Sequence, residues 1–263
     1  MRLVDLTRTL DATDYDRLPD PVRPSASIIT PKIEHYEPAG KGADVMCAIF
    51  GCERHDLPDG EGWGEERIAM NSHIGTHVDA PLHYGSTCEG EPARTIEQIG
   101  LDELFCDGLV LDVRDMATPG EGISVEALDA AIEANGGELT PGCAVMIRTG
   151  MEVYGLTDLA NYAYPGMTRA GTLHLAELGA KVLGTDAMGW DRPFFVMRQD
   201  FQETGDPATI WDGHFAGRDR EVFIVQQLTN LAALPPHGFQ VGFFPIKLAH
   251  CSAAPARVVA FLP

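Results

Sequence analysis

Hydrophobic positions along the chain fall mostly into short runs that predict strands. Residues 3–7 alternate between apolar and polar side chains, which is typical of a short strand. Later runs are almost continuously apolar, as expected for strands that are buried on both faces. These runs cover residues 108–113, 144–150, 182–187, 222–231, 240–248 and 257–262.

Helical spacing is clearest at Val125–Asn135, where Leu128 and Ile132 lie on one stripe. Ser124 is placed to cap the start of this helix, and a Gly pair follows its end. We expect a second helix from Thr168 to Ala180 and a short one over residues 95–101. Because strands and helices alternate here, the sequence predicts an α/β fold with parallel pairing.

The stretch from residue 11 to residue 64 lacks regular periodicity and is rich in Pro, Gly and charged side chains. We expect long loops that fold over a pocket, with Trp63 either stacking on a substrate or packing in the core. The chain has no internal repeat and no linker-like segment, so we expect a single domain over residues 1–263.

Residues 71–85 carry most of the candidate chemistry. His73, His77, Asp79 and His83 are all odd-numbered, so an extended chain would present them on one face. The spacing of the first two would also suit a helix, but Gly75, Pro81 and several β-branched residues disfavour one. We therefore expect a strand with one face on the core and the other on a site.

A straight strand would hold the backbones of His73 and His77 about 13 Å apart, at roughly 3.3 Å per residue. Two imidazoles that bind one ion must come closer, so we expect the chain to bend at Gly75. Two imidazoles and the Asp79 carboxylate leave coordination positions open, which is typical of a catalytic ion. A polar strand with hydrogen-bonded histidines is the simpler alternative, but four ionisable groups on one face disfavour it.

The pattern His-x-Gly-Thr-His-x-Asp-x-Pro-x-His over residues 73–83 resembles the signature of the cyclase-like metal-dependent hydrolase family. That family includes kynurenine formamidases, isatin hydrolases and polyketide cyclases. The resemblance implies a swivelling β/β/α domain with a mixed central sheet, a few helices, and assembly as a homodimer or homotetramer. It also places Arg148 near the site, as a support or as the partner of a carboxylate.

The resemblance further implies a second half of the site. Members with two metal ions use a His and a Glu at the spacing at which this chain has His214 and Gln226. An amide is a weak, uncharged ligand, so we expect one divalent ion, Zn²⁺ or Mn²⁺, held by His73, His77 and Asp79. His214 is then free to act as a hydrogen-bond donor or proton carrier.

These assignments lead to a hydrolase that opens a small cyclic or aryl amide, imide or lactone with metal-activated water. His83 would move the proton, and His214 or Gln227 would stabilise the developing oxyanion. The residues expected to contact the substrate are Trp63, Trp190, Phe194 and Gln226.

Two other functions are compatible with the same residues. A polyketide-type cyclase would use the ion and His83 for aldol ring closure, without releasing an acid. A protein that only binds metal would surround its ion completely with protein ligands, which the three predicted ligands do not do.

The amino-acid composition limits the kinds of partner that this chain is expected to bind. The chain has 263 residues, 19 basic and 39 acidic side chains and a net charge of −20, so we expect neither nucleic acid nor an anionic membrane as a partner. No apolar run approaches the roughly 20 residues that span a bilayer. The six cysteines form no Cys-x-x-Cys pair, and we expect reduced, buried thiols in a cytoplasmic enzyme that acts on a small molecule.

Overall fold

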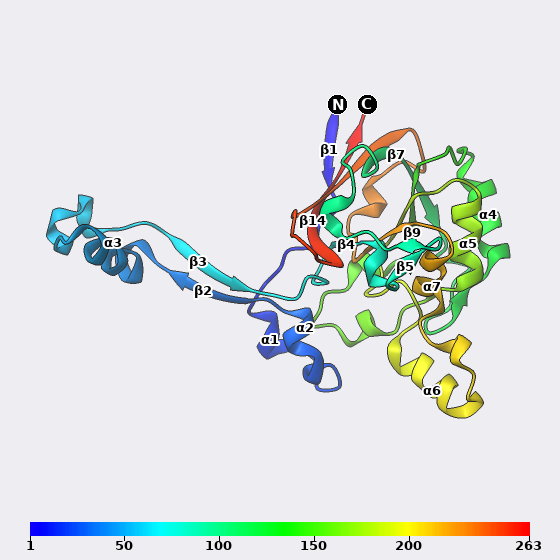
Figure 1. Cartoon of the computed structure of the whole chain (residues 1–263), viewed down its shortest axis with the longest axis horizontal. Coiled ribbons are helices and arrows are strands. Elements are labelled where there is room, and N and C mark those ends of the chain that lie inside the picture. The colour runs from blue at the N-terminus through cyan, green and yellow to red at the C-terminus, as the bar shows by residue number, and fades with distance from the viewer.

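An eight-stranded mixed sheet forms the centre of the molecule in the computed structural model, which describes residues 1–263 (Figure 1). Its strands, in spatial order, are β1 (Arg2–Asp5), β14 (Ala253–Leu262), β13 (Phe239–Pro245), β7 (Phe105–Asp112), β9 (Ala144–Arg148), β11 (Val182–Thr185), β12 (Phe223–Gln226) and β4 (His77–Asp79). β7, β9, β11 and β12 run parallel, and the other neighbours pair antiparallel. β4 also pairs with β14, so the sheet closes on itself like a barrel.

The predicted α/β class with a mixed central sheet is confirmed, and all the strands predicted from apolar runs form. Their ends differ by a few residues. The run over 222–231 stops being a strand after Gln226, because Gln227 adopts a left-handed backbone conformation with φ of 58° and turns the chain out of the sheet.

Helices α4 (Val125–Asn135) and α5 (Arg169–Glu177) lie side by side along one side of the body (Figure 1). The start of α4 is as predicted, because the Ser124 hydroxyl accepts a hydrogen bond from the backbone N–H of Ala127. Its end is also as predicted, since Gly136 adopts φ of 70°. The short helix expected over residues 95–101 is only a 3₁₀ turn at Ile96–Gln98.

Two groups of buried apolar side chains stabilise this body. One lies within the closed sheet and includes Val78, Met146 and Val225. The other lies between the sheet and α4 and α5, and includes Leu111, Ile147 and Leu175. Successive residues of one strand point into different groups: Met146 of β9 belongs to the first group, and Ile147 belongs to the second. Burial on both faces explains why these strands read as unbroken apolar runs.

The remaining elements lie around this body. The helices are α1 (Asp14–Arg17), α2 (Ala26–Ile29), α3 (Ala43–Phe50), α6 (Phe194–Thr204) and α7 (Asp212–Phe215). The two-stranded sheets pair β2 (Lys32–Tyr36) with β3 (Glu65–Ala69), β5 (Thr87–Cys88) with β6 (Glu91–Pro92), and β8 (Gly122–Ile123) with β10 (Gly166–Met167).

The prediction of long loops folding over a pocket between residues 11 and 64 is wrong. Residues 31–70, which we call the arm, form a hairpin of β2 and β3 that carries α3 at its far end and projects away from the body (Figure 1). Strand pairing holds its shaft together, with Ile33 opposite Ile68. The tip is tightly packed, because a Cβ at Gly42 would lie only 2.0 Å from the carbonyl oxygen of Trp63.

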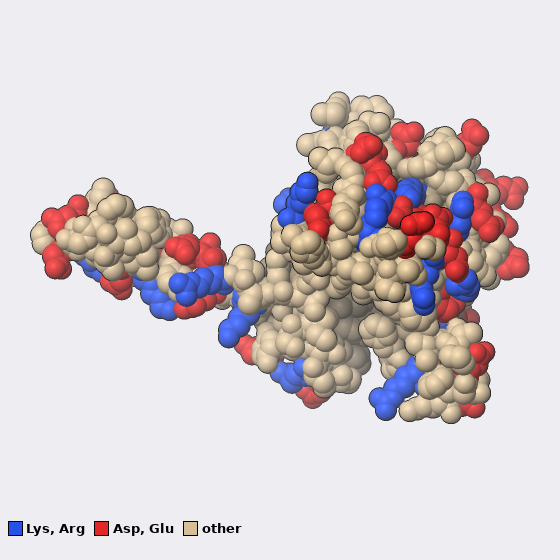
Figure 2. Space-filling model, viewed as in Figure 1, with Lys and Arg blue, Asp and Glu red and all other residues tan.

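Charged side chains are distributed over the body and the arm, with Lys and Arg interspersed among the more numerous Asp and Glu (Figure 2). No helix of the structure is both long and apolar enough to cross a membrane. All six cysteines are free thiols. The expectation that they are buried holds only for Cys88 and Cys143, and the other four are partly exposed.

Candidate metal centre

The candidate centre is built on β4, the strand that closes the sheet. β4 pairs with β12 on one side and with β14 on the other, so Asp79 lies opposite both Ile224 and Ala253. Every residue of the strand is buried. Strand pairing on both sides holds the backbone of His77 and Asp79 in place before any ion binds.

The bend predicted between His73 and His77 is present at Gly75, whose φ is 58°. A Cβ at this position would lie 2.4 Å from Cδ2 of Leu10. Beside it, the Thr76 hydroxyl donates to the carbonyl of Gln227 at 2.7 Å and accepts from the backbone N–H of Arg8 at 2.9 Å. The extended segment is therefore shorter than expected, and His83 lies in a 3₁₀ turn at Pro81–His83.

The Asp79 carboxylate lies at the centre of the cluster and is completely buried. Its Oδ1 lies 2.7 Å from Nδ1 of His73, and its Oδ2 accepts from the side-chain amide of Gln226 at 2.7 Å. Burial alone would raise the pKa of this carboxyl. The surrounding imidazoles outweigh burial and hold the pKa well below its usual value. Asp79 therefore remains an anion.

His77 presents a nitrogen that has no hydrogen-bond partner. Its Nδ1 lies 2.7 Å from the carbonyl oxygen of Gly75, to which it donates, so Nε2 is the nitrogen that is left for another partner. This Nε2 is buried and lies 3.4 Å from Oδ1 of Asp79. A carbonyl that orients the ring and a bare nitrogen beside an anion are the usual features of an imidazole that binds metal.

His73 and His83 form the more accessible side of the cluster. Their ring centroids are 3.8 Å apart, and Nε2 of His73 also lies 3.1 Å from the hydroxyl of Ser252. Donor atoms of His73, Asp79 and His83 all lie within 4.8 Å of one another. Burial lowers the pKa of His83 to about 3, although Asp79 opposes this shift. The His83 ring is therefore neutral and can accept a proton or bind an ion.

His214 approaches the opposite side of Asp79 from α7, with its Nε2 at 3.5 Å from Oδ2. Its Nδ1 is paired with the buried carboxylate of Asp191. Burial disfavours the imidazolium, but Asp191 and Asp79 outweigh it and raise the pKa of His214 to about 9. His214 is therefore a donor at neutral pH in the metal-free protein.

The two glutamines have different roles in this arrangement. Gln226 donates to Asp79 and lies 3.3 Å from Nε2 of His214, so its amide holds the buried carboxylate. The backbone of Gln227 is fixed on both sides, because its N–H donates to the carbonyl of Ala187 and its carbonyl accepts from the Thr76 hydroxyl. The structure therefore places Gln226, which was predicted to contact the substrate, behind the carboxylate.

Trp211 is a site residue that the sequence did not indicate. Its ring stacks on His214, with the centroids 4.3 Å apart and the planes at 18°, and lies edge-on to His83 at 4.9 Å. The residue adopts a left-handed conformation with φ of 53°. Because that conformation is uncommon for tryptophan, no local sequence pattern signals it.

The other aromatic residues predicted to line the pocket lie elsewhere. Trp190 is 1 % exposed, and its indole N–H donates to the hydroxyl of Thr172. Trp190 belongs to the group of buried apolar side chains between the sheet and the helices, so it lies in the core and does not face a substrate. Trp63 lies in the arm, next to Gly42. Phe194 is 73 % exposed on the first turn of α6.

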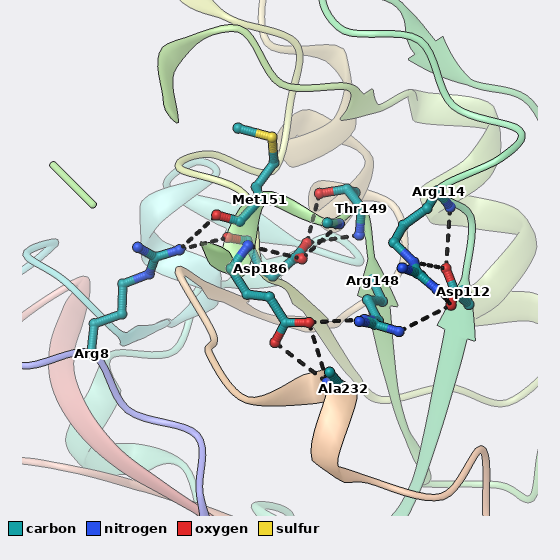
Figure 3. Close-up of polar contacts among 10 residues, drawn as sticks. Arg8, Asp112, Arg114, Arg148, Thr149, Met151, Asp186 and Ala232 are labelled. Atoms are coloured by element: carbon teal, nitrogen blue, oxygen red, sulfur yellow. Dashed lines mark hydrogen bonds and ion pairs between the residues drawn. The ribbon is translucent and has the colours of Figure 1, made fainter. Parts of the chain in front are cut away.

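A buried polar network supports the loop beside the centre (Figure 3). The Asp186 carboxylate accepts from the Thr149 hydroxyl at 2.6 Å and from the backbone N–H of Gly150 at 2.9 Å. The Arg8 guanidinium donates to the carbonyls of Met151 and Asp186. Arg8 therefore ties this loop to the segment that also holds Thr76.

Arg148 lies farther along the same network (Figure 3). It donates to Glu152 at 2.8 Å and to Asp112 at 3.2 Å. Of the two roles considered for Arg148, the structure therefore shows the pairing with carboxylates.

Comparisons with known proteins find relatives of this chain. The sequence model of the family described as Putative cyclase matches residues 4–192. A kynurenine formamidase of Salinibacter ruber is 26 % identical over 193 residues, which cover 73 % of this chain and 77 % of the relative.

Two solved structures share the fold. Isatin hydrolase A from Ralstonia solanacearum is 23 % identical with a TM-score of 0.72, over 100 % of this chain and 92 % of the other. A protein described as a potential metal-dependent hydrolase with cyclase activity is 20 % identical with a TM-score of 0.65, over 100 % and 98 % of the two chains.

Proposed function

Because this chain belongs to the family described as Putative cyclase, we propose that it is a metal-dependent hydrolase of small aryl or cyclic amides, imides or lactones. One observation carries the proposal. The Nε2 of His77 is buried without a partner at 3.4 Å from a carboxylate that stays ionised in the protein interior. An unpartnered buried nitrogen beside a buried anion is costly unless a cation binds between them.

The donor set fits a divalent ion. His73, His77 and Asp79 supply two imidazole nitrogens and one carboxylate, a combination that suits Zn²⁺ or Mn²⁺. Gln226, which the family resemblance sets at the position of a second ion's carboxylate, donates its amide to Asp79. This contact supports a single ion. When bound, a divalent ion supplies a Lewis acid for a carbonyl and lowers the pKa of water to about 7.

His83 is proposed as the proton carrier. It is partly accessible, whereas His77 and Asp79 are buried, and its ring lies beside that of His73. We propose that this ring takes a proton from the attacking water and returns it to the leaving nitrogen or oxygen. Its lowered pKa makes it a weak base, so it supports the second of these transfers more than the first.

His214 is proposed to stabilise the negative charge that develops on the substrate oxygen. Asp191 orients its ring and favours the protonated form, which leaves Nε2 as a donor directed toward the cluster. A preorganised donor of this kind is worth roughly 3–4 kcal/mol in the transition state. Gln227 is the alternative donor for the same oxygen.

The aromatic surface beside these groups supports an aryl substrate. Trp211 lies against both His83 and His214, and Phe215 lies edge-on to it at 5.2 Å. Similarity to a kynurenine formamidase and an isatin hydrolase supports the same class.

The experiment is a substrate panel of formylkynurenine, isatin, dienelactones and aryl esters, assayed with Zn²⁺ and with Mn²⁺ while acid release is followed by a pH indicator. We expect at least one substrate to release acid and His77→Ala to abolish the release. His174→Ala is the matched control, because His174 pairs with Asp129 at the surface. Absence of acid release across the panel would contradict the proposal.

The second candidate reaction is ring closure of a β-ketone. The family description and the description of one structural relative both name a cyclase, which supports this candidate. The same His83 would then take a proton from carbon instead of water. Formation of a cyclised product without acid release would identify this reaction.

A further inference from the structure

Two cysteines lie close together at the tip of the arm, away from the candidate metal centre. Cys47 is in the last turn of α3, and Cys52 follows the end of that helix. Both are free thiols and both are partly exposed, whereas Cys88 and Cys143 are buried. Neither Cys47 nor Cys52 has a role in the proposed reaction.

The backbone brings these two residues together. Gly51 adopts a left-handed conformation with φ of 65°, which turns the chain back at the end of α3. The backbone N–H groups of Gly51 and Cys52 therefore both donate to the carbonyl of Cys47, at 2.9 and 3.2 Å. At a helix end of this type, the side chains in the positions of Cys47 and Cys52 frequently contact each other.

The environment of the pair suits a disulfide. A disulfide needs Cα atoms about 4.4–6.8 Å apart, which a direct hydrogen bond between the two backbones allows. Burial raises the pKa of Cys47, and the Cys52 thiol beside it raises that pKa further. Because this shift does not stabilise the thiolate, it does not favour the reduced form over a disulfide.

The other neighbouring cysteines are shielded from an oxidant. Cys106 lies on β7, and Cys143 lies directly before β9, which pairs with β7. Cys143 is only 1 % exposed. Burial raises the pKa of Cys106 to about 12 and that of Cys143 to about 11. The pair at the tip of the arm is therefore the one that an oxidant in solution reaches first.

We propose that Cys47 and Cys52 are a redox-active pair that a small disulfide in solution oxidises to an intramolecular disulfide. One cysteine thiolate attacks the oxidant and displaces one thiol, which leaves a mixed disulfide on the protein. The second cysteine thiolate attacks the protein sulfur of that bond and displaces the other thiol. Overall the two cysteines lose two protons and two electrons, and the oxidant becomes two thiols.

Such a bond would stabilise the tip of the arm. Cys52 leads into the 3₁₀ turn Arg54–Asp56, and Arg54 donates to the carbonyls of Ala39 and Gly40. A covalent link to α3 restrains the segment that carries Arg54, so the oxidised tip opens less often than the reduced tip. The proposal rests on this thiol pair and stands independently of the proposed reaction.

The first test equilibrates the wild-type protein with glutathione buffers, from fully reduced to fully oxidised, at about pH 8, close to the ordinary pKa of a thiol. Remaining thiols are alkylated before digestion with trypsin. Cleavage after Lys41 and Arg54 releases both cysteines in one peptide, residues 42–54. We expect this peptide to lose two hydrogens as the buffer becomes oxidising. A peptide that stays reduced, or that carries glutathione in place of an internal bond, would overturn the proposal.

A single-cysteine variant tests the two-step exchange. In Cys52→Ser the second displacement cannot occur, so we expect glutathione to remain on Cys47. Cys106→Ser is the matched control, and it should form the internal bond as the wild type does. Loss of the bond in Cys106→Ser would show that Cys106 takes part and would contradict the assignment.

Hydrogen exchange measures the effect on the arm. We expect amides of residues 43–56 to exchange at least about 10-fold more slowly in the oxidised wild type than in the reduced one, as a disulfide constrains local opening. Cys52→Ser should exchange at the same rate in both buffers. Equal exchange in the oxidised and reduced wild type would refute the stabilising role of the bond.

Discussion

Single residues decide the chemistry of this centre. For His83 two roles are compatible with its position, that of a metal ligand and that of a proton carrier. Its donor nitrogen lies near those of His73 and Asp79, so distance alone permits it to bind the ion. We assign the ligand role to His77 instead, because Nε2 of His77 is buried and has no other partner.

His83→Ala separates the two readings. If His83 carries protons, the variant keeps its metal while kcat falls about 10²–10⁴-fold, the usual contribution of general acid–base catalysis. Metal content by mass spectrometry and steady-state kinetics are measured on the same sample. Loss of metal together with activity would make His83 a ligand.

Trp211 is expected to influence substrate selection. An aromatic pair contributes about 0.5–1.5 kcal/mol beyond buried area, so Trp211→Ala should lower kcat/KM for aryl substrates about 2- to 12-fold. Trp211→Phe should retain most of the activity because it keeps a ring over His214. Equal losses in the two variants would show that stacking is not what Trp211 supplies. The measurement is kcat/KM of each variant for an aryl substrate and for an alkyl substrate.

At the scale of elements, the bend at Gly75 brings His73 and His77 to one place. Gly75→Ala puts a Cβ into a left-handed conformation against Leu10, which costs about 1–2 kcal/mol and should weaken metal binding. Gly90→Ala is the control, because Gly90 also has a positive φ, 86°, but nothing within 4 Å and no contact with the centre. Thermal unfolding and metal titration of both variants are compared. Equal metal affinity in the two would contradict this role.

Elements with local signals were predictable from the sequence, and those that depend on distant contacts were not. Helix α4 has its cap and its terminating glycine in adjacent residues, so its limits were correct. The bend at Gly75 followed from the reach of two imidazoles. The arm was missed, because its packing joins Gly42 to Trp63 across twenty residues. The aromatic pocket was wrong because no local pattern shows that Trp190 faces the core and Trp211 the centre.

At the scale of the whole molecule, an ion-pair cluster joins distant parts of the chain. Arg94 donates to Glu103 and to Glu221, and Lys181 also donates to Glu221. Hydrogen bonds from Arg94 hold the pKa of Glu103 below its usual value of 4.5. Burial alone would raise the pKa of Glu221, but Arg94 and Lys181 outweigh it and lower this pKa as well.

Because both carboxyl pKa values are lowered by folding, their stabilising effect is complete above about pH 4.5 and is lost as the pH falls through the folded-state values. Arg94→Met should cost about 1–2 kcal/mol at pH 7. It should also flatten the loss of stability between pH 5 and pH 3. Urea unfolding of the chelated proteins at several pH values measures both effects. A variant with the pH dependence of the wild type would contradict the assignment.

We propose that one divalent ion binds at the cluster of His73, His77 and Asp79 and is needed for turnover. Its most direct measurement is the metal content of the purified protein, before and after chelation, together with activity on the same samples. We expect about one ion per chain, loss of turnover on chelation, and recovery of both when Zn²⁺ or Mn²⁺ is returned. Full turnover by a protein that mass spectrometry shows to be free of metal would contradict it.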